Sequence, residues 1–218
     1  LPKIIWQPIL RGIILNTRIF KTRRAYKKIW REETNESPLR YYTRRQAELL
    51  DQRMEDPTVI VDWAMRYGNP SIDSRLKRLQ QQGCESIVVL PLYPQYCAAT
   101  TATVCDEVFR SLMKMRWQPQ VQIVPRYYDH PGYIKMLVGQ LERRLERMET
   151  HPQRIILSYH GVPKQYLEKG DPYHCQCLVT TRLIQESWPH KDIAIESTFQ
   201  SRFGPQEWLQ PYTDVTLE

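Results

Sequence analysis

SIVVLPL at positions 86–92 is the stretch that decides the fold class, because it is an uninterrupted apolar run of strand length. Such runs are typical of strands that are buried on both faces of a parallel sheet. Gly83 stands just before the run, where a glycine can end a preceding helix. The residues at 100–115 have the composition of a helix and follow the run directly. A buried strand between two helices predicts an α/β fold.

The alternation of strands and helices continues in both directions from this run. Further strands are expected at 58–64, 121–124, 154–158 and 192–197. Further helices are expected at 8–30, 38–54, 71–82, 134–148 and 174–188. This order predicts parallel sheets with helices on both faces. The spacing alone fits either one five-stranded sheet or a split near 128–131 into two similar halves.

The opening segment 1–31 contains basic and apolar residues and no acidic residue. This mixture suits an anionic membrane surface, but it equally suits a helix that packs its isoleucines on a core. The net charge of +7 comes with no nucleic-acid motif, so we expect no nucleic-acid partner. With no apolar run of about 18 residues and no signal-peptide cleavage site, we expect a cytoplasmic protein, with peripheral attachment to the inner face of a membrane as an open alternative.

The chain has five cysteines and no secretion signal, so we expect reduced thiols. Cys175 and Cys177 are closer together than the usual zinc-binding spacing and have no partner pair in the sequence. Two reduced thiols are therefore favoured over a metal or cluster site.

Aromatic, amide, histidine and other polar side chains follow four of the expected strands, where ligands of parallel sheets collect. These side chains are Arg66 and Tyr67, Gln95 and Tyr96, His160, and Gln200 and Ser201. Together they favour a flat, largely apolar ligand, although any one aromatic ring could simply fill the rim of the sheet. Glycine-rich phosphate loops, nucleophile elbows and H-E-x-x-H are absent from the sequence, which disfavours nucleotide binding and hydrolysis.

His160 is the most chemically suggestive residue, because it follows an expected strand and precedes a glycine that permits a tight turn. An imidazole there can accept a proton or ligate a divalent metal. A hydrogen-bonded structural histidine is the alternative.

Six stretches, in order and over nearly the whole chain, resemble motifs of the ferrochelatase family. They are MRYGNP at 65–70, LPLYPQY at 90–96, SYHGVP at 158–163, KGDPY at 169–173, and FQSRFGP at 199–205 with WLQPYTD at 208–214. The resemblance implies an enzyme that inserts ferrous iron into a porphyrin, protoporphyrin IX above all, as the last step of haem biosynthesis. Fe²⁺ would be a substrate, and no cofactor would be required.

The resemblance also implies a fold of two Rossmann-like domains, each with a four-stranded parallel sheet, around a porphyrin cleft. The first would span 1–128, including a helical lip at 1–50, and the second, incomplete, would span 129–218. His160 would be the proton acceptor and metal ligand. The porphyrin would contact Arg66, Tyr67, Gln95, Tyr96, Gln200, Ser201 and Trp208.

The sequence departs from the family pattern at its ends. The glutamate that partners the histidine would lie beyond Glu218, so we expect a chain truncated at both ends and inactive by itself. Cys97 falls one position short of a cluster ligand, so no iron–sulfur cluster is expected. A non-catalytic porphyrin- or haem-binding module and a related tetrapyrrole chelatase for another metal are the rival hypotheses. The choice between protoporphyrin and coproporphyrin, and the oligomeric state, stay open.

Overall fold

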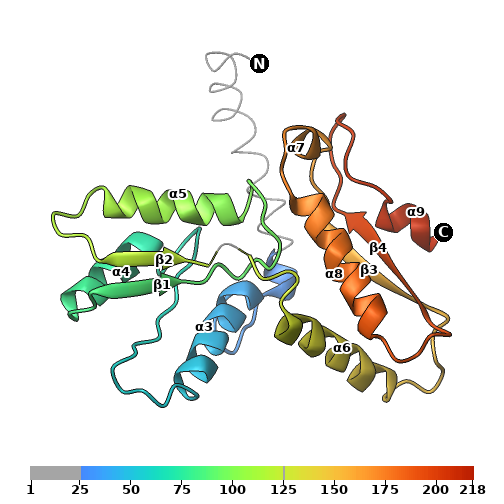
Figure 1. The fold of residues 1–218 in the computed structure, drawn as a ribbon, viewed down its shortest axis with the longest axis horizontal. Helices are drawn as coiled ribbons and strands as arrows, with labels where there is room; N and C mark the ends of the chain where they lie inside the picture. Colours follow the sequence, from blue (N-terminus) through green and yellow to red (C-terminus); the bar gives the residue numbers. More distant parts are fainter. Residues whose placement is uncertain (1–25, 125) are drawn as a thin grey trace. The chain divides into compact units, whose positions relative to one another are not determined.

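The computed structural model of this chain describes residues 26–124 and 126–218 (Figure 1). It comprises two compact units, residues 1–78 and 79–218. Nearly all of the expected helix 8–30 and of the basic apolar segment 1–31 lies outside the described residues, so the membrane-surface interpretation stays a prediction. The predicted division at residue 128 stays a prediction as well.

In the first unit, helix α3 (Pro38–Asp51) confirms the helix expected at 38–54. Ser37 is its N-cap, and the Ser37 hydroxyl oxygen accepts a hydrogen bond from the Arg40 amide at 3.3 Å. Pro38 occupies the first turn, where its missing N–H leaves no hydrogen bond unmade. The helix therefore begins where its local sequence specifies.

Helix α4 (Ile72–Gln81) confirms the next expected helix, at 71–82. Gly83 follows it with a positive φ of 86°, a conformation that glycine adopts at no steric cost. The Cys84 amide then donates to the Leu79 carbonyl at 3.0 Å, which closes the last turn.

The strand expected at 58–64 is wrong, because these residues form no strand ladder in the structure. The amide and the hydroxyl of Thr58 both donate to the Asp56 carboxylate, at 2.8 and 2.7 Å. This local turn occupies groups that a strand would use for pairing. β-branched composition alone does not make a strand without a neighbour to pair with.

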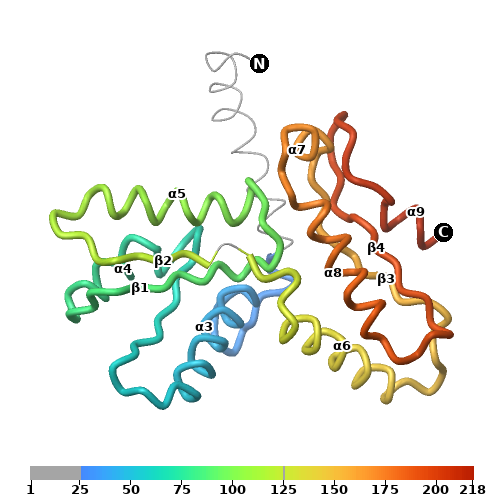
Figure 2. The backbone as a smooth tube through the Cα atoms, in the orientation of Figure 1, coloured from blue at the N-terminus to red at the C-terminus, as the bar shows by residue number. Residues whose placement is uncertain are grey.

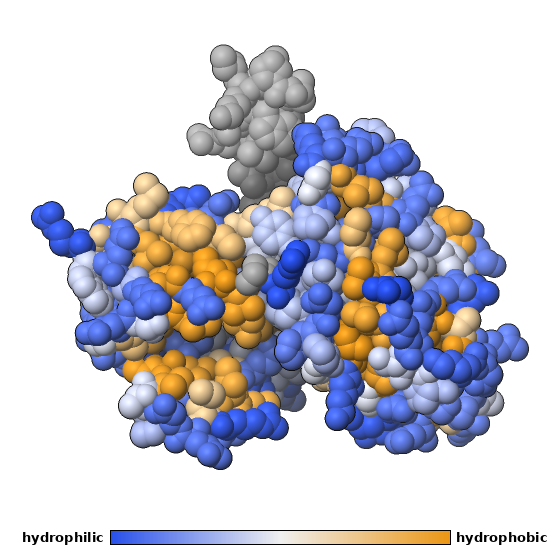
Figure 3. All heavy atoms as spheres, viewed as in Figure 1, coloured by the Kyte–Doolittle hydropathy of each residue, from blue (hydrophilic) through white to orange (hydrophobic). Residues whose placement is uncertain are grey.

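In the second unit, strands β1 (Ser86–Val89) and β2 (Gln120–Ile123) pair in parallel, with Ser86 opposite Gln120. Helix α5 (Thr101–Leu112) connects them and runs beside the pair (Figure 1). The expectation that β1 is buried on both faces is wrong, because Val88 is 63 % exposed while Ile87 is 6 % exposed. Figure 3 accordingly shows apolar surface over the part of the molecule that contains this pair.

A second parallel pair consists of β3 (Arg154–His160) and β4 (Ala194–Gln200), joined by α8 (Tyr173–Ser187). Helix α6 (Pro131–Leu145) packs against α8, as the backbone trace in Figure 2 shows. The core beneath them contains Ile134, Val138, Leu145, Ile184, Trp188, Ile193 and Ile195.

Two short helices, α7 (Gln165–Glu168) and α9 (Thr213–Leu217), were not predicted, because segments of four or five residues show no helical period. The described part of the chain thus has an α/β fold with two small parallel sheets flanked by helices. No helix within it is long and apolar enough to cross a membrane.

Candidate active site

The carboxyl ends of β3 and β4 place His160 and Gln200 side by side. They form the last register pair of the ladder, and both side chains are exposed. Because side chains alternate along a strand, the preceding pair, Tyr159 and Phe199, faces the opposite side. There it joins the apolar cluster around Cys177 and Leu209. The sheet therefore presents an imidazole and an amide on one face and anchors them from the other.

The His160 ring has a defined orientation. Its Nδ1 lies 2.7 Å from the Gly161 carbonyl oxygen. Because a carbonyl oxygen only accepts hydrogen bonds, Nδ1 is the protonated nitrogen in this contact, and Nε2 of the neutral ring keeps its lone pair. Nε2 has no hydrogen-bond partner among the described residues. It can accept a proton or bind a metal ion.

Gly161 allows β4 to approach this turn closely. Its amide donates to the Gln200 carbonyl at 2.8 Å. A Cβ at this position would lie 2.8 Å from the same oxygen and 3.3 Å from Cε3 of Trp208. The glycine predicted to permit a tight turn is therefore needed for a close contact between strands.

Trp208 is 6 % exposed and lies against Gly161. Its indole N–H donates to the Phe203 carbonyl at 2.9 Å. The adjacent Leu209 amide donates to the Val162 carbonyl at 3.0 Å, so this segment pairs with the turn that follows His160. The Trp208 ring therefore packs against the turn that follows His160. Its contact with a porphyrin stays a prediction.

Ser201 follows Gln200 directly and has a φ of +70°. A non-glycine residue in this region is strained, and such residues cluster at functional sites. Arg202 then pairs with Asp214 at 2.8 Å and lies 4.1 Å above the Tyr212 ring. The chain therefore forms a turn at the end of β4, and Ser201 is exposed in this turn.

The loop after β1 is attached to the segment around α8, within the same unit. Gln95 is 8 % exposed, and its amide donates to the Thr180 hydroxyl oxygen at 3.1 Å. The Tyr96 amide donates to Oε1 of Gln176 at 2.7 Å. The structure therefore brings Gln95 and Tyr96 to the helix that joins β3 to β4.

Burial raises the pKa of the Tyr96 phenol, so Tyr96 stays protonated at neutral pH.

Asp171 and Tyr173 of the KGDPY stretch reach both parts of this site, and sequence reasoning assigned them no role there. The Asp171 carboxylate accepts from the Ala98 amide at 2.7 Å and from the Tyr173 amide at 3.0 Å. The Tyr173 hydroxyl donates to the His160 carbonyl at 2.9 Å. Their motif was the only signal in the sequence.

Arg66 and Tyr67 lie in the first unit, in the turn between Met65 and α4. The Arg66 guanidinium lies 4.5 Å above the Tyr67 ring, and Tyr67 is 72 % exposed. The Met65 amide donates to the Pro70 carbonyl at 2.8 Å and closes the turn. Their relation to His160 stays a prediction.

Residues 26–124 and 126–218 contain no group of three or more histidine, cysteine or acidic side chains that could hold a metal ion. The five cysteines are free thiols. Burial raises the pKa of Cys97 to about 11 and that of Cys177 to about 12. These two thiols are therefore protonated at neutral pH.

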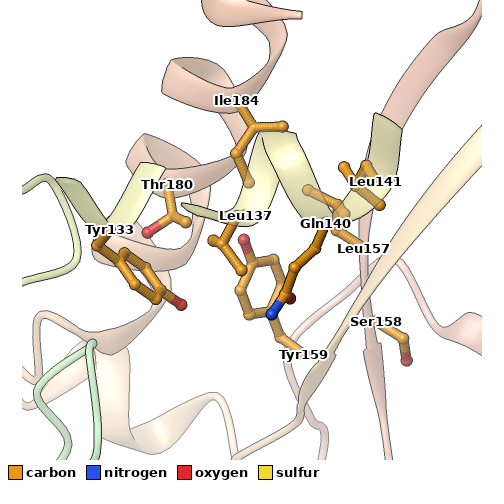
Figure 4. A pocket seen from close by; sticks show the side chains of 9 residues that line it. All are labelled: Tyr133, Leu137, Gln140, Leu141, Leu157, Ser158, Tyr159, Thr180 and Ile184. Atoms are coloured by element: carbon orange, nitrogen blue, oxygen red, sulfur yellow. The ribbon is translucent and has the colours of Figure 1, made fainter. Parts of the chain in front are cut away.

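A pocket of about 230 Å³ lies beside the β3 strand, between α6 and α8. Figure 4 shows Tyr133, Leu137 and Gln140 from α6 around it, with Tyr159 from β3. Pockets for small molecules usually measure about 300–1,000 Å³. This apolar pocket is therefore too small to hold a large planar ligand by itself.

Comparison with known proteins gives one consistent result. The family model described as ferrochelatase matches residues 1–218. A ferrochelatase of Brucella anthropi is 57 % identical over 218 residues, which cover 100 % of this chain and 62 % of the relative. Ferrochelatases of Allorhizobium ampelinum and Rhizobium meliloti are 55 % and 54 % identical, each over 99 % of this chain and 63 % and 64 % of the relative. The chain thus spans somewhat less than two thirds of the length of these curated relatives.

Proposed function

This chain belongs to the ferrochelatase family, and from that premise we propose that the full-length protein containing it inserts Fe²⁺ into protoporphyrin IX to form haem. Full-length here means the length of the curated relatives. The observation that carries the proposal is His160, which lies at the carboxyl end of β3 with Nε2 available. Because SYHGVP at 158–163 resembles a ferrochelatase motif, His160 is proposed to be the family's proton-accepting and metal-binding histidine.

The chemistry requires a base. A free porphyrin carries two N–H protons at its centre, and both must leave as Fe²⁺ binds to the four nitrogens. His160 can accept one proton at Nε2 and pass it to water before it accepts the next. Alternatively, the same nitrogen can bind the incoming Fe²⁺ before the porphyrin does. The Gly161 carbonyl supports either role, because its contact with Nδ1 fixes the ring orientation and leaves Nε2 available.

The porphyrin site is proposed to include Arg66, Tyr67, Gln95, Tyr96, Gln200, Ser201 and Trp208. Their chemistry supports this, since aromatic rings and a few polar groups suit a flat apolar ligand. The finer fold, two Rossmann-like domains with four-stranded sheets, is part of the same proposal. The two parallel pairs, β1–β2 and β3–β4, are compatible with it.

The basic apolar segment 1–31 is proposed to attach the protein to the inner face of a membrane. Basic side chains and isoleucines are interspersed along it without an acidic residue. Such a segment gains both apolar burial and attraction to anionic lipids.

The test is anaerobic addition of Fe²⁺ to protoporphyrin IX with the full-length protein, followed by absorbance and by loss of porphyrin fluorescence. We expect conversion to haem, and a loss of about 10²–10⁴-fold in the His160→Ala variant, the usual contribution of a positioned base. His151→Ala is the matched control, because His151 is exposed and outside the strand ends.

A porphyrin spectrum that shifts on binding but never converts would favour a non-catalytic binding module. Conversion at the parental rate by His160→Ala would remove His160 from the chemistry.

A further inference from the structure

The Asp171 carboxylate connects two segments that are 73 residues apart in sequence. Its Oδ2 accepts from the Ala98 amide at 2.7 Å, and its Oδ1 accepts from the Tyr173 amide at 3.0 Å. Each oxygen therefore has one main-chain partner. Hydrogen bonds to a charged acceptor are short and about twice as strong as neutral ones, so this carboxylate sets the distance between the two amides.

Tyr173 extends the connection to His160. Its hydroxyl donates to the His160 carbonyl at 2.9 Å. Its ring packs in the apolar cluster of Cys177, Phe199 and Leu209, which are at most 4 % exposed. A phenol held in such a cluster has little freedom, so its hydroxyl is a fixed point for the His160 peptide.

The peptide after His160 is held from the opposite side as well. The Gly161 amide donates to Gln200, and the Gly161 carbonyl accepts from the His160 ring. The position of the imidazole therefore depends on the peptide geometry around the His160 carbonyl, and Tyr173 makes the one side-chain contact to that carbonyl among the described residues.

Ala98 lies in the loop that contains Gln95 and Tyr96, both proposed to contact the porphyrin. This loop has two further attachments to α8, through Thr180 and Gln176. Removal of the Asp171 contact should therefore leave the loop folded and change its position relative to His160.

We propose that Asp171 and Tyr173 are positioning residues that hold His160 at a set distance from the Gln95–Tyr96 loop, through the path Ala98–Asp171–Tyr173–His160. This inference rests on the proposed function for its catalytic consequence. The two residues do not touch the reacting atoms. They determine how accurately the imidazole is oriented toward a porphyrin bound against the Gln95–Tyr96 loop. A misplacement of about 1 Å can cost about 10²-fold in rate.

The test uses the full-length protein and the variants Asp171→Asn, Tyr173→Phe and their combination. Tyr173→Phe removes one hydroxyl and keeps the ring in its cluster. Tyr166→Phe and Asp192→Asn are matched controls, because neither side chain takes part in these contacts. We expect kcat to fall at least about 10-fold in each single variant, with the porphyrin KM changed less than about 3-fold and both controls at the parental rate.

The double variant separates positioning from general damage. Two residues that act through one path are not additive, so the double variant should be only slightly slower than the worse single variant. Multiplied losses, or losses that parallel the unfolded fraction, would overturn the proposal. So would variants that convert porphyrin at the parental rate.

A second readout does not depend on turnover. At pH 8, ¹⁵N NMR of the His160 ring should show the Nδ1–H tautomer in the parent and in both controls, and a mixture with the Nε2–H tautomer in the two single variants. An unchanged tautomer in Tyr173→Phe and Asp171→Asn would overturn the positioning path even if haem is formed. A parent that forms no haem, yet shows this tautomer shift in the variants, would refute the proposed function and retain the positioning path.

Discussion

Gly161→Ala should destabilise the protein by about 1.5–4.5 kcal/mol, because the structure leaves no space for a methyl group there. The new Cβ would lie 2.8 Å from the Gln200 carbonyl oxygen and 3.3 Å from Cε3 of Trp208. The first neighbour is main chain and the second is a buried ring, so neither can move freely. A methyl group forced into a packed site costs about 1–3 kcal/mol, and loss of the hydrogen bond from Gly161 to Gln200 adds about 0.5–1.5 kcal/mol.

Denaturant unfolding of the two variants Gly161→Ala and Gly139→Ala measures this effect. Gly139 lies within α6, and its Cβ would meet only the flexible end of Arg143 at 3.5 Å. The control should therefore be neutral, or stabilised by up to about 1 kcal/mol through the higher helix propensity of alanine. For a chain of this size, a loss of about 3 kcal/mol corresponds to a fall of roughly 6–12 °C in Tm.

The reasoning is refuted if Gly161→Ala stays within about 0.5 kcal/mol of the parent at an unchanged m-value. In that case β4 could withdraw from the turn at little cost, and the close approach would not be required.

Three further predictions concern the first unit and the thiols. Ser37→Ala should lower the free energy of unfolding by about 1 kcal/mol, because the Arg40 amide loses its N-cap acceptor. Thermal unfolding measures this loss, with Ser74→Ala in α4 as the control. Arg44 above all, then a hydrogen bond from Thr34 and the charge of Arg40, hold the pKa of the Glu36 carboxyl below its usual 4.5. Stability from this carboxylate is therefore present above pH 4.5 and lost as pH falls below it. Unfolding of Glu36→Gln between pH 3 and 7 should therefore show a weaker loss at acid pH than the parent, and an equal loss would contradict the assignment. At pH 8, iodoacetamide should label the exposed Cys175 well before the buried Cys97 and Cys177, and mass spectrometry of the peptides would measure this. Rapid labelling of Cys177 would contradict the prediction and mean that its helix opens readily.

Several elements were predictable because their causes are local. Ser37 and Pro38 specify the start of α3, and Gly83 specifies the end of α4. The apolar run at 154–158 is a strand, and the structure extends this strand to His160, where the ladder continues opposite Gln200. Caps, turns and apolar runs act within a few residues, so a single sequence displays them.

The two wrong predictions also have a physical cause. The residues at 58–64 have strand composition, yet the Asp56 turn competes for their hydrogen bonds and no partner strand pairs with them. β1 has the composition of a strand buried on two faces, yet Val88 is exposed. In both cases the outcome depends on which neighbours are present, and that information is not local.

The sequence by itself therefore determined the parallel α/β class and the order of most helices and strands, but not the absence of a strand at 58–64 or the short helices α7 and α9. It also placed polar and aromatic side chains after β1, β3 and β4. It also determined the family, through motifs that are short and contiguous. Only the tertiary structure decided how these motifs meet: Gln95 at Thr180, Ala98 at Asp171, and Tyr173 at the His160 carbonyl. The physical reason is that each such contact joins residues that are not neighbours along the chain. Their distance in space is set by the packing of the elements between them, whereas a motif is specified by neighbouring residues alone.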